Sequence, residues 1–591
     1  MSKVHSCFGK TRCSSSHGGG TAPTCFFMSH KHRIVPSVRV CVCVRERVQS
    51  PQMCNLAAPF SRHQRPDEHV DQSCDGVRPP VAPGHRGEDD GHGSGAVVYL
   101  QRRDGRRRRR PQKHGRAGRT ELPDHTLLAL CEEILQHHAA DAMKHVHWCL
   151  QIEHKRIYGP LWKSKYGPLV VVNVASAELI EQVLRQEGRL PVRTDMPHWR
   201  AYRELRNQAH GPLSEMGANW QRIRSILNPR MLKPKHVSSY ADRVNEVVAD
   251  FVERVRWLRE TTGGGVMVHN VTEELYKFAF EGICSVLFET RMGCMNKDVP
   301  EETQKFIFSV GEMFRLSPII VLFPKWQWPY LPFWTKFVAV WDHLFKVAEE
   351  LVQKKVEELQ HEEQLERNVE GAYLTHLLLS KQMDITEILG SITELLLAGV
   401  DTTSNTISWA LYHLAREPDI QEKLYQEVIR ACPAHRMPNS DDIARMPFLK
   451  AVIRETLRLY PVVPGNARLT VEDDIVVGDH LFPKGTLFHL CHYAVSFDDS
   501  VFPDPRCFLP QRWLRGTEEK ATQHPFGSVP FGFGIRACLG RRVAELEMYL
   551  LLSTLIRHFE VRPDPSGAAV TPITRTLLCP AKPINLQFVD R

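Results

Sequence analysis

The sequence lacks a long hydrophobic run near its N-terminus, where no apolar stretch reaches the roughly 18 residues of a membrane-spanning helix. It also lacks the regular cysteine spacing of a small disulfide-stabilised secreted domain, although it contains 16 cysteines. Acidic residues are scarce at the start: Glu46 is the only one in the first 60 residues, against eight Lys and Arg. These absences argue against a membrane anchor and a secreted scaffold, and they favour an organelle transit segment.

Residues 1–120 are predicted to be a disordered leader that contains a mitochondrial transit region. They are rich in Ser, Gly, Pro, His and Arg and contain no long segment with helical or strand periodicity. The basic run from Arg106 to Arg110 leaves open a nucleic-acid or nuclear-import role, but a solvated leader without nucleic-acid binding is the expectation. Residues 121–591 are predicted to form one catalytic domain.

The sequence pattern of the rest of the chain predicts a mainly helical protein with small β-sheets. A strand is predicted within 165–174, and short strand-like pieces separated by Pro and Gly occupy 462–490. Long helical patterns cover 220–227, 240–257, 347–360, 385–415 and 541–559. This arrangement suits a cofactor that is buried between helices.

The strongest signal is a glycine-rich loop around Cys538, with the sequence FGFGIRACLG from Phe531 to Gly540. A thiolate ligand needs a tight loop whose backbone N–H groups face the sulfur, which Gly532 and Gly534 permit. The helix predicted directly after the loop would also lower the thiol pKa. A lone Cys in such a turn is usually structural, but five specified positions within ten residues match by chance only about once in a million. Cys538 is therefore predicted to bind a metal.

Three further motifs are each common by themselves but occur here together. Glu455 and Arg458 lie three residues apart on one helix face, where an ordinary surface ion pair is the alternative. Arg512 lies in the segment FLPQRW downstream. Trp220 and Arg224 lie upstream in a helical pattern that could equally be a plain amphipathic helix.

A fourth motif interrupts an apolar helix with the sequence AGVDTT, which runs from Ala398 to Thr403. The small Ala-Gly pair leaves room for a ligand against the backbone, and the hydroxyls can disturb the helical hydrogen bonds. Asp401 and Thr402 can relay protons to a reacting centre. A solvated edge of the helix is the alternative interpretation.

At this point the chain resembles the cytochrome P-450 superfamily, because the signature F-x-x-G-x-R-x-C-x-G is met without departure and the other motifs follow in the family's order. The resemblance implies haem b, with Cys538 as the axial thiolate that favours cleavage of the O–O bond, held between the long distal helix and the helix after the Cys loop. It implies proton delivery by Asp401 and Thr402. It also implies a network of Glu455, Arg458 and Arg512 behind the haem. The implied haem-binding residues are Trp220, Arg224, Arg468, Phe531, Arg536, Cys538 and Gly540.

Basic residues at two places resemble the mitochondrial branch of the superfamily. Lys450 and Arg454 lie on one helical face, and Arg541 and Arg542 follow the Cys loop. In that branch such residues bind a small acidic ferredoxin, which an NADPH-dependent reductase reduces. Incidental basic residues on a surface helix are the alternative.

Longer stretches resemble the mitochondrial sterol 26/27-hydroxylases of bile-acid synthesis, among them PVRTDM from Pro191 and LYPVVPGNARL from Leu459. The resemblance covers roughly three quarters of the chain, from about His145. It implies hydroxylation of a sterol side chain with O₂. Gly465 stands where these enzymes usually have Thr and resembles the vitamin D hydroxylases, so a secosteroid substrate is the alternative. A non-catalytic haem-thiolate sensor is a further alternative, against which Asp401 and Thr402 argue.

An aromatic stretch spans residues 306–345 and includes Trp326, Trp328 and Trp334. Lys325 and four prolines exclude a spanning helix. An interfacial patch that dips into one leaflet is expected, with core packing as the alternative. The predicted location is the inner mitochondrial membrane, peripheral on the matrix side.

Overall fold

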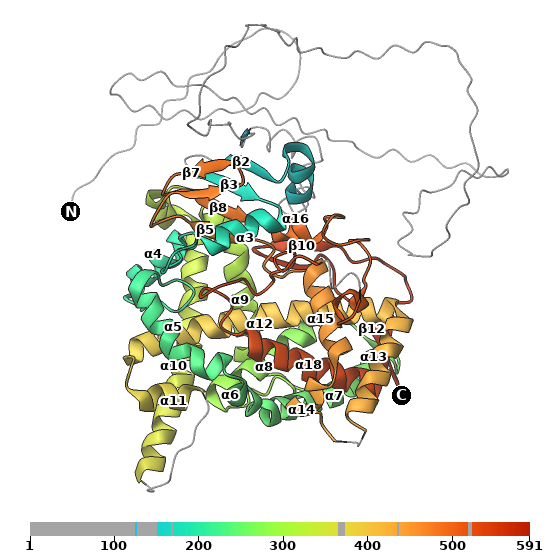
Figure 1. Ribbon diagram of the computed structural model, residues 1–591. Coiled ribbons are helices and arrows are strands. Elements are labelled where there is room, and N and C mark those ends of the chain that lie inside the picture. The colour runs from blue at the N-terminus through green and yellow to red at the C-terminus, as the bar shows by residue number, and fades with distance from the viewer. Residues whose placement is uncertain (1–123, 127–149, 167–168, 365–372, 434–435, 518–522) are drawn as a thin grey trace, which may run out of the picture. The chain divides into compact units, whose positions relative to one another are not determined.

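The computed structural model describes residues 124–126, 150–166, 169–364, 373–433, 436–517 and 523–591. The predicted leader, 1–120, lies outside these residues. The described part is mainly helical with small β-sheets, as the sequence predicts. Figure 1 shows the strands β2, β3, β5 and β8 gathered on one side of the helices that surround α12.

The helices fall into a long and a short group, and residues 150–158 are also helical. The longer helices are α5 (Gly217–Leu232), α7 (Ala241–Thr261), α8 (Val271–Phe288), α9 (Glu301–Ile320), α10 (Pro332–Gln364), α12 (Ile385–Arg416), α13 (Pro418–Ala431), α15 (Pro447–Leu459) and α18 (Arg541–His558). The shorter ones are α3 (Ala177–Arg185), α4 (Pro197–Arg206), α6 (Pro234–Ser238), α11 (Tyr373–Ser380), α14 (Ser440–Ala444), α16 (His492–Ser496) and the 3₁₀ helices η1 (Lys325–Tyr330) and η2 (Pro510–Trp513). The predicted segments 385–415 and 541–559 match α12 and α18 to within one residue at each end, whereas the predicted segments 220–227, 240–257 and 347–360 cover only parts of the longer helices α5, α7 and α10 or differ at one end.

The strands form one larger and three smaller sheets. The larger sheet has the order β1 (Asp124–Thr126), β2 (Leu161–Tyr166), β3 (Leu169–Val174), β8 (Leu487–Leu490) and β5 (Asn466–Leu469). The others pair β4 (Met267–Val268), β12 (Leu586–Asp590) and β9 (Phe559–Pro563); β6 (Ile475–Val477) and β7 (His480–Phe482); and β10 (Pro572–Arg575) and β11 (Leu577–Pro580). Strand β3 runs parallel to β8, with Val174 opposite Leu490, and β5 runs antiparallel to β8, with Asn466 opposite the same leucine. This pairing carries Arg468 of β5 to the wall of the cavity described below.

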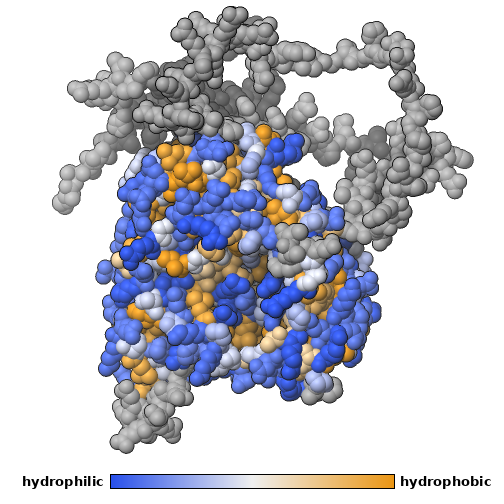
Figure 2. Space-filling model, in the orientation of Figure 1, coloured by the Kyte–Doolittle hydropathy of each residue, from blue (hydrophilic) through white to orange (hydrophobic). Residues whose placement is uncertain are grey.

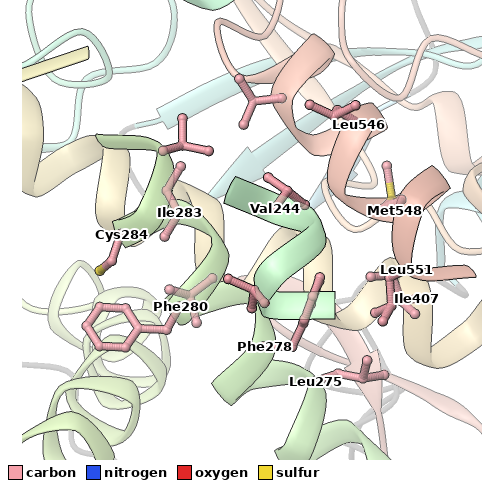
Figure 3. Close-up of a cluster of buried hydrophobic side chains, with 14 of the residues drawn as sticks. Val244, Leu275, Phe278, Phe280, Ile283, Cys284, Ile407, Leu546, Met548 and Leu551 are labelled. Atoms are coloured by element: carbon pink, nitrogen blue, oxygen red, sulfur yellow. The ribbon is translucent and has the colours of Figure 1, made fainter. Parts of the chain in front are cut away.

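The main core lies where α7, α8, α12 and α18 pack together, and Figure 3 shows side chains from all four helices meeting there. Helix α8 is buried on nearly all its faces, as expected of a helix that is apolar around its circumference. Its close approach to α12 depends on Gly399, because a Cβ there would lie 2.8 Å from Cγ1 of Ile283. Gly399 and its neighbour Ala398 also line the cavity described below.

Helix α12 is the longest apolar element near the site, and its ends are set by local chemistry. The Asp384 side chain caps its N-terminus by accepting a hydrogen bond from the backbone N–H of Glu387. The Glu387 carboxylate in turn accepts a hydrogen bond from the backbone N–H of Asp384. At the other end Pro418 begins α13 immediately after Glu417. The cap fixes where α12 starts and therefore which of its turns face the site.

The aromatic stretch divides between core and surface. Trp328 and Trp334 are buried and stack with ring centroids 5.3 Å apart, so core packing holds for part of the stretch. Leu322, Trp326 and Tyr330 are 78%, 71% and 84% exposed. No helix among the described residues is long and apolar enough to cross a membrane. Elsewhere the face drawn in Figure 2 is mostly hydrophilic, with hydrophobic residues in separate patches.

Candidate functional site

The Cys loop is a tight turn that ends where α18 begins. Gly532 and Gly534 have φ of 71° and 72°, a left-handed conformation that side chains with a Cβ rarely adopt. The backbone N–H of Cys538 donates to the carbonyl of Phe531 (2.8 Å), which closes the loop. The thiol therefore projects from a turn whose shape is fixed by backbone conformation.

The Cys538 thiol faces a cavity that is also lined by Phe531, Gly540 and four residues of α12: Ala398, Gly399, Thr402 and Thr403. Because the thiol faces this cavity its surface is accessible, although protein surrounds it on the other sides. Burial raises its pKa, while the Gly540 backbone N–H and the charges of Arg193 and Arg224 act in the opposite direction. The Gly540 N–H and the two arginine charges would stabilise a thiolate at Cys538.

Four guanidiniums converge beside the loop, from Arg193, Arg224, Arg468 and Arg536. Burial and mutual repulsion lower the pKa of Arg193 to about 10 and that of Arg536 to about 9. Arg468 pairs with Glu187 at 2.6 Å. With a Cys538 thiolate also counted, the cluster keeps two unmatched positive charges.

Trp220 completes the arginine cluster from α5. The Arg536 guanidinium lies 3.7 Å from the centroid of the Trp220 ring, and its Nε donates to the carbonyl of Pro191 (2.9 Å). Among the described residues, neither Nε1 of Trp220 nor Nε of Arg193 has a hydrogen-bond partner, although both are buried. Buried donors without partners beside excess positive charge are the environment that a bound dianion satisfies.

Behind the loop, Glu455 is the centre of a buried charge network. Both its oxygens accept from Arg458 (2.9 and 2.7 Å), and Oε1 also accepts from Arg512 (3.2 Å). Trp513 and the backbone N–H of Leu509 complete the set, at 2.8 and 3.0 Å. A buried carboxylate is tolerated only when its hydrogen bonds are satisfied, so the network specifies the path of the chain before the Cys loop.

The two guanidiniums of this network bind backbone carbonyls on the same segment. Arg458 donates to the carbonyls of Ser496, Pro505 and Cys507. Arg512 donates to that of Pro503 (2.9 Å). Glu455 and Arg458 from one motif and Arg512 from another thus meet at one place. The sequence analysis missed only the other donors to Glu455, which are the Trp513 indole and the Leu509 backbone N–H.

On α12 the two predicted proton-relay residues face different surroundings. Thr402 lines the cavity, and its hydroxyl donates to the carbonyl of Ala398 (2.6 Å). Asp401 is buried and is not among the cavity-lining residues; its charge acts instead on Tyr276 of α8 and Cys579 of β11. Burial raises the pKa of Asp401 to about 7. This carboxyl therefore exchanges its proton near neutral pH.

The four predicted ferredoxin-binding residues lie on two packed helices, α15 and α18. Arg454, Arg541 and Arg542 are exposed. Lys450 is half-buried and donates to the carbonyl of Ala444 (3.3 Å). Arg454 and Arg541 both act on the pKa of Tyr549, which shows that the two helices present their charges to a common region.

Gly465 does not contact the cavity, although its neighbours Val463 and Asn466 line it. A Cβ on Gly465 would lie 2.2 Å from Nε2 of His489 in β8. The His489 ring thus occupies the space where a Thr side chain would stand. The loop around Gly465 therefore reaches the cavity through Val463 and Asn466, while Gly465 itself packs against His489.

Comparison with known proteins agrees with this geometry. A family model described as cytochrome P-450 matches residues 130–588. The chain belongs to the cytochrome P-450 family. It is a monooxygenase of the haem-thiolate type, and the arginine cluster fits that group, since haem carries the two propionates that the two unmatched charges require.

Several mitochondrial enzymes are similar over most of their length. The mitochondrial sterol 26-hydroxylase of Rattus norvegicus is 46% identical over 447 residues, which cover 75% of this chain and 84% of that one. The human enzyme of that name is 46% identical over 448 residues, with the same coverage. The mitochondrial 25-hydroxyvitamin D-1 alpha hydroxylase of Homo sapiens is 44% identical over 449 residues, 75% of this chain and 88% of that one.

Two residues of the haem site escaped the sequence analysis as site residues. Arg193 lies in the stretch PVRTDM, which indicated only the branch of the family. Its Nη2 donates to the carbonyl of Arg536 (2.6 Å). Glu187 pairs with Arg468 and also lies against the Cys loop, where a Cβ on Gly534 would lie 2.2 Å from its Oε1. No local pattern marks either residue, since their partners are hundreds of positions away.

We predict that Cys538→Ala abolishes the thiolate ligation of the haem in this cytochrome P-450. The reduced protein with CO should lose the red-shifted Soret band of thiolate ligation, or lose haem altogether, because no other cysteine lines the cavity among the described residues. Cys579→Ala is the matched control and should keep the band. A normal thiolate spectrum from Cys538→Ala contradicts the assignment.

The close approach of Gly465 to His489 gives a second prediction. Gly465→Thr should lower the free energy of unfolding by about 1–3 kcal/mol, the usual cost of overpacking, because the His489 ring must move. The double variant Gly465→Thr/His489→Val should recover most of this loss in thermal unfolding. Equal losses in the single and double variants would show that the two side chains do not compete for the same space.

Proposed function

We propose that this monooxygenase hydroxylates the side chain of a sterol, such as cholesterol or a bile-acid intermediate, with O₂ and electrons from a ferredoxin. The observation that carries the proposal is the 46% identity with sterol 26-hydroxylases over three quarters of the chain. Haem supplies the oxygen-activating chemistry when it is bound. The apolar part of the cavity wall, which includes Leu213, Leu395 and Val462, suits an aliphatic side chain.

The chain's own contribution to turnover is binding, orientation and proton control. Thr402 holds a hydroxyl at the cavity wall, and Asp401, one residue earlier, is the titratable group beside it on α12. Because the pKa of Asp401 is raised to about 7, the carboxyl holds a proton below neutral pH and can pass it on. We assign proton delivery to this pair.

A vitamin D secosteroid is the second candidate substrate, supported by the 44% identity with 25-hydroxyvitamin D-1 alpha hydroxylases. Gly465, the residue that favoured it in the sequence, faces His489 and not the cavity. It therefore cannot select the substrate by direct contact, and the sterol remains the first choice.

The exposed side chains around η1 support peripheral binding to a membrane. Val321, Leu322, Trp326 and Tyr330 lie close together in sequence between α9 and α10, with 46% to 84% of their surfaces exposed. Indole and phenol rings prefer the membrane interface, so this patch can dip into one leaflet and receive a lipophilic substrate. The mitochondrial relatives support a mitochondrial location. We propose that the protein binds the inner membrane peripherally, on the matrix side.

Reconstitution tests the proposed function directly. The haem-loaded enzyme is combined with a mitochondrial-type ferredoxin, its NADPH-dependent reductase and either cholesterol or 25-hydroxyvitamin D, and the products are identified by mass spectrometry. A side-chain hydroxysterol supports the proposal. Conversion of the secosteroid alone would establish the second candidate, and conversion of neither would refute both.

Proton delivery predicts the behaviour of Thr402→Ala. The variant should consume reductant but form product roughly 100-fold more slowly, the usual contribution of a positioned proton donor, and release the reduced oxygen as peroxide. Thr402→Ser keeps the hydroxyl and should remain coupled. The ratio of peroxide to hydroxylated product measures this effect, and an unchanged ratio in Thr402→Ala would remove the residue from the mechanism.

The basic surface predicts charge-dependent binding of the ferredoxin. Lys450→Glu together with Arg454→Glu should raise the ferredoxin concentration for half-maximal turnover roughly tenfold, or about 1.4 kcal/mol. The wild-type interaction should weaken as ionic strength rises past ~0.1 M, where charges are screened beyond about 10 Å. Sterol binding, followed by the spin-state shift of the oxidised haem, should not change. Lost sterol binding with unchanged ferredoxin dependence would give these residues a structural role.

A further inference from the structure

Helix α9 contains a proline close to its C-terminal end. Pro318 lies inside the helix, two residues before its last residue, Ile320. A proline has no backbone N–H, and its ring crowds the carbonyl four positions earlier, which in α9 is that of Phe314. The Phe314 carbonyl therefore lacks its usual helical donor and turns outward, where a group from another segment can bind it.

That group is the side chain of Thr576, which lies 262 residues later in the chain. Its hydroxyl donates to the Phe314 carbonyl at 2.8 Å. Thr576 is the single residue between strands β10 and β11, and the strand residues on either side of it, Arg575 and Leu577, pair with each other. The turn of this hairpin thus bonds the carbonyl that Pro318 leaves free.

Thr576 adopts a backbone conformation that its own side chain disfavours. Its φ is 68°, in the left-handed region, where a β-branched residue is a genuine outlier. It is the only β-branched residue among the described non-glycine residues with positive φ. Glycine would form the same turn without strain, so the turn alone does not explain a threonine at this position. The bond that its hydroxyl makes does explain it.

The β10–β11 hairpin is also fixed to the wall of the haem cavity. The backbone N–H of Leu578 donates to the carbonyl of Val462 (2.9 Å), and Val462 lines the cavity. Strand β11 packs against α12, with Leu578 and Cys579 buried. Thr576 therefore connects the end of α9 to a hairpin that is itself attached to the cavity wall.

The end of α9 has a second attachment, to α4. Ser317, the residue before Pro318, donates its hydroxyl to the carbonyl of Met313 (2.8 Å) and accepts from Nε1 of Trp199 (3.4 Å). Ser317 and Trp199 are buried, whereas Pro318 and Thr576 are exposed. The attachment to α4 is therefore part of the core. The exposed bond to the hairpin is the one that can open without unfolding of the core.

We propose that the Thr576 hydroxyl and the Phe314 carbonyl form a latch, which Pro318 makes possible and which positions the end of α9 relative to the cavity wall. The proposal rests on the proposed function, in which the exposed patch directly after α9 receives a lipophilic substrate, and it deepens that function. The latch fixes the base of the patch with respect to Val462, so opening it lets bound substrate leave faster. Thr576 is a positioning residue, because it acts through α9 and does not line the cavity.

A double-mutant cycle on the full-length, haem-loaded protein tests the latch without any substrate. Thr576→Val removes the hydroxyl but keeps the branched shape, and Pro318→Ala returns to α9 an N–H that can bind the Phe314 carbonyl. Amide hydrogen exchange is followed in residues 313–322. Thr576→Val should speed this exchange about threefold, within the range that one hydrogen bond supports, and should change nothing in the Pro318→Ala background. An equal effect in both backgrounds, or none in either, would overturn the latch.

Substrate binding tests what the latch does. The dissociation constant and dissociation rate are measured from the spin-state shift of the oxidised haem. Thr576→Val should weaken binding about threefold to tenfold through faster dissociation, with haem content unchanged. Thr576→Ser keeps the hydroxyl and should bind as the wild type does. Thr262→Val is the matched control, because it also removes an exposed hydroxyl that donates to a helical carbonyl, that of Leu258 in α7 (2.9 Å).

Thr576→Gly separates the latch from the turn. Glycine relieves the left-handed strain but has no hydroxyl, so the midpoint of thermal unfolding should not fall, while substrate binding should weaken as in Thr576→Val. If Thr576→Gly binds substrate as tightly as the wild type, the threonine serves only the turn and the proposal is wrong.

The outcomes distinguish the latch from the proposed function. Binding is measured with whichever of cholesterol and 25-hydroxyvitamin D shifts the spin state of the wild type. Equal binding by the wild type and Thr576→Val would overturn the proposal and leave the hydroxylase assignment intact. If neither compound binds, the proposed function fails, and the hydrogen-exchange cycle still decides whether the latch exists.

Discussion

The excess positive charge of four buried guanidiniums is the constraint on which the site depends. Arg193, Arg224, Arg468 and Arg536 repel one another in a poorly solvated place, and Glu187 offsets only part of their charge. Such a cluster is costly unless an anion completes it. Haem carries two propionates that would supply that anion, so we infer that binding of the cofactor and stability of this region are coupled. The Cys loop gains from the same cluster, because Arg193 and Arg224 also lower the pKa of the Cys538 thiol.

The Glu455 network performs a different task with similar chemistry. Its charges are already satisfied within the protein, since Glu455 accepts from Arg458, Arg512, Trp513 and the backbone of Leu509. It therefore needs no ligand, and it fixes the segment before the Cys loop whether or not haem is bound. The Glu455 network is complete within the protein, whereas the arginine cluster is incomplete, and we propose that it binds the cofactor.

The proton control that we propose at α12 depends on a buried acid rather than on a salt bridge. The pKa of Asp401 is raised to about 7 because its carboxyl is buried without a cation beside it. A buried group with such a value can hold a proton and still release it near neutral pH. The small residue Gly399 contributes to this burial, because it lets α8 close over α12.

The sequence by itself determined the features that depend on consecutive residues: the Cys538 loop, the long helices and the motifs that contain Glu455 and Thr402. Helical periodicity and the turn preferences of glycine act over a few residues, so they can be recognised locally. Only the tertiary structure decided that Arg193 and Glu187 join the haem site, that Gly465 faces His489 and not the cavity, and that Thr576 bonds the Phe314 carbonyl. These contacts join segments up to hundreds of positions apart, and such contacts arise from helix packing and strand register rather than from any local pattern.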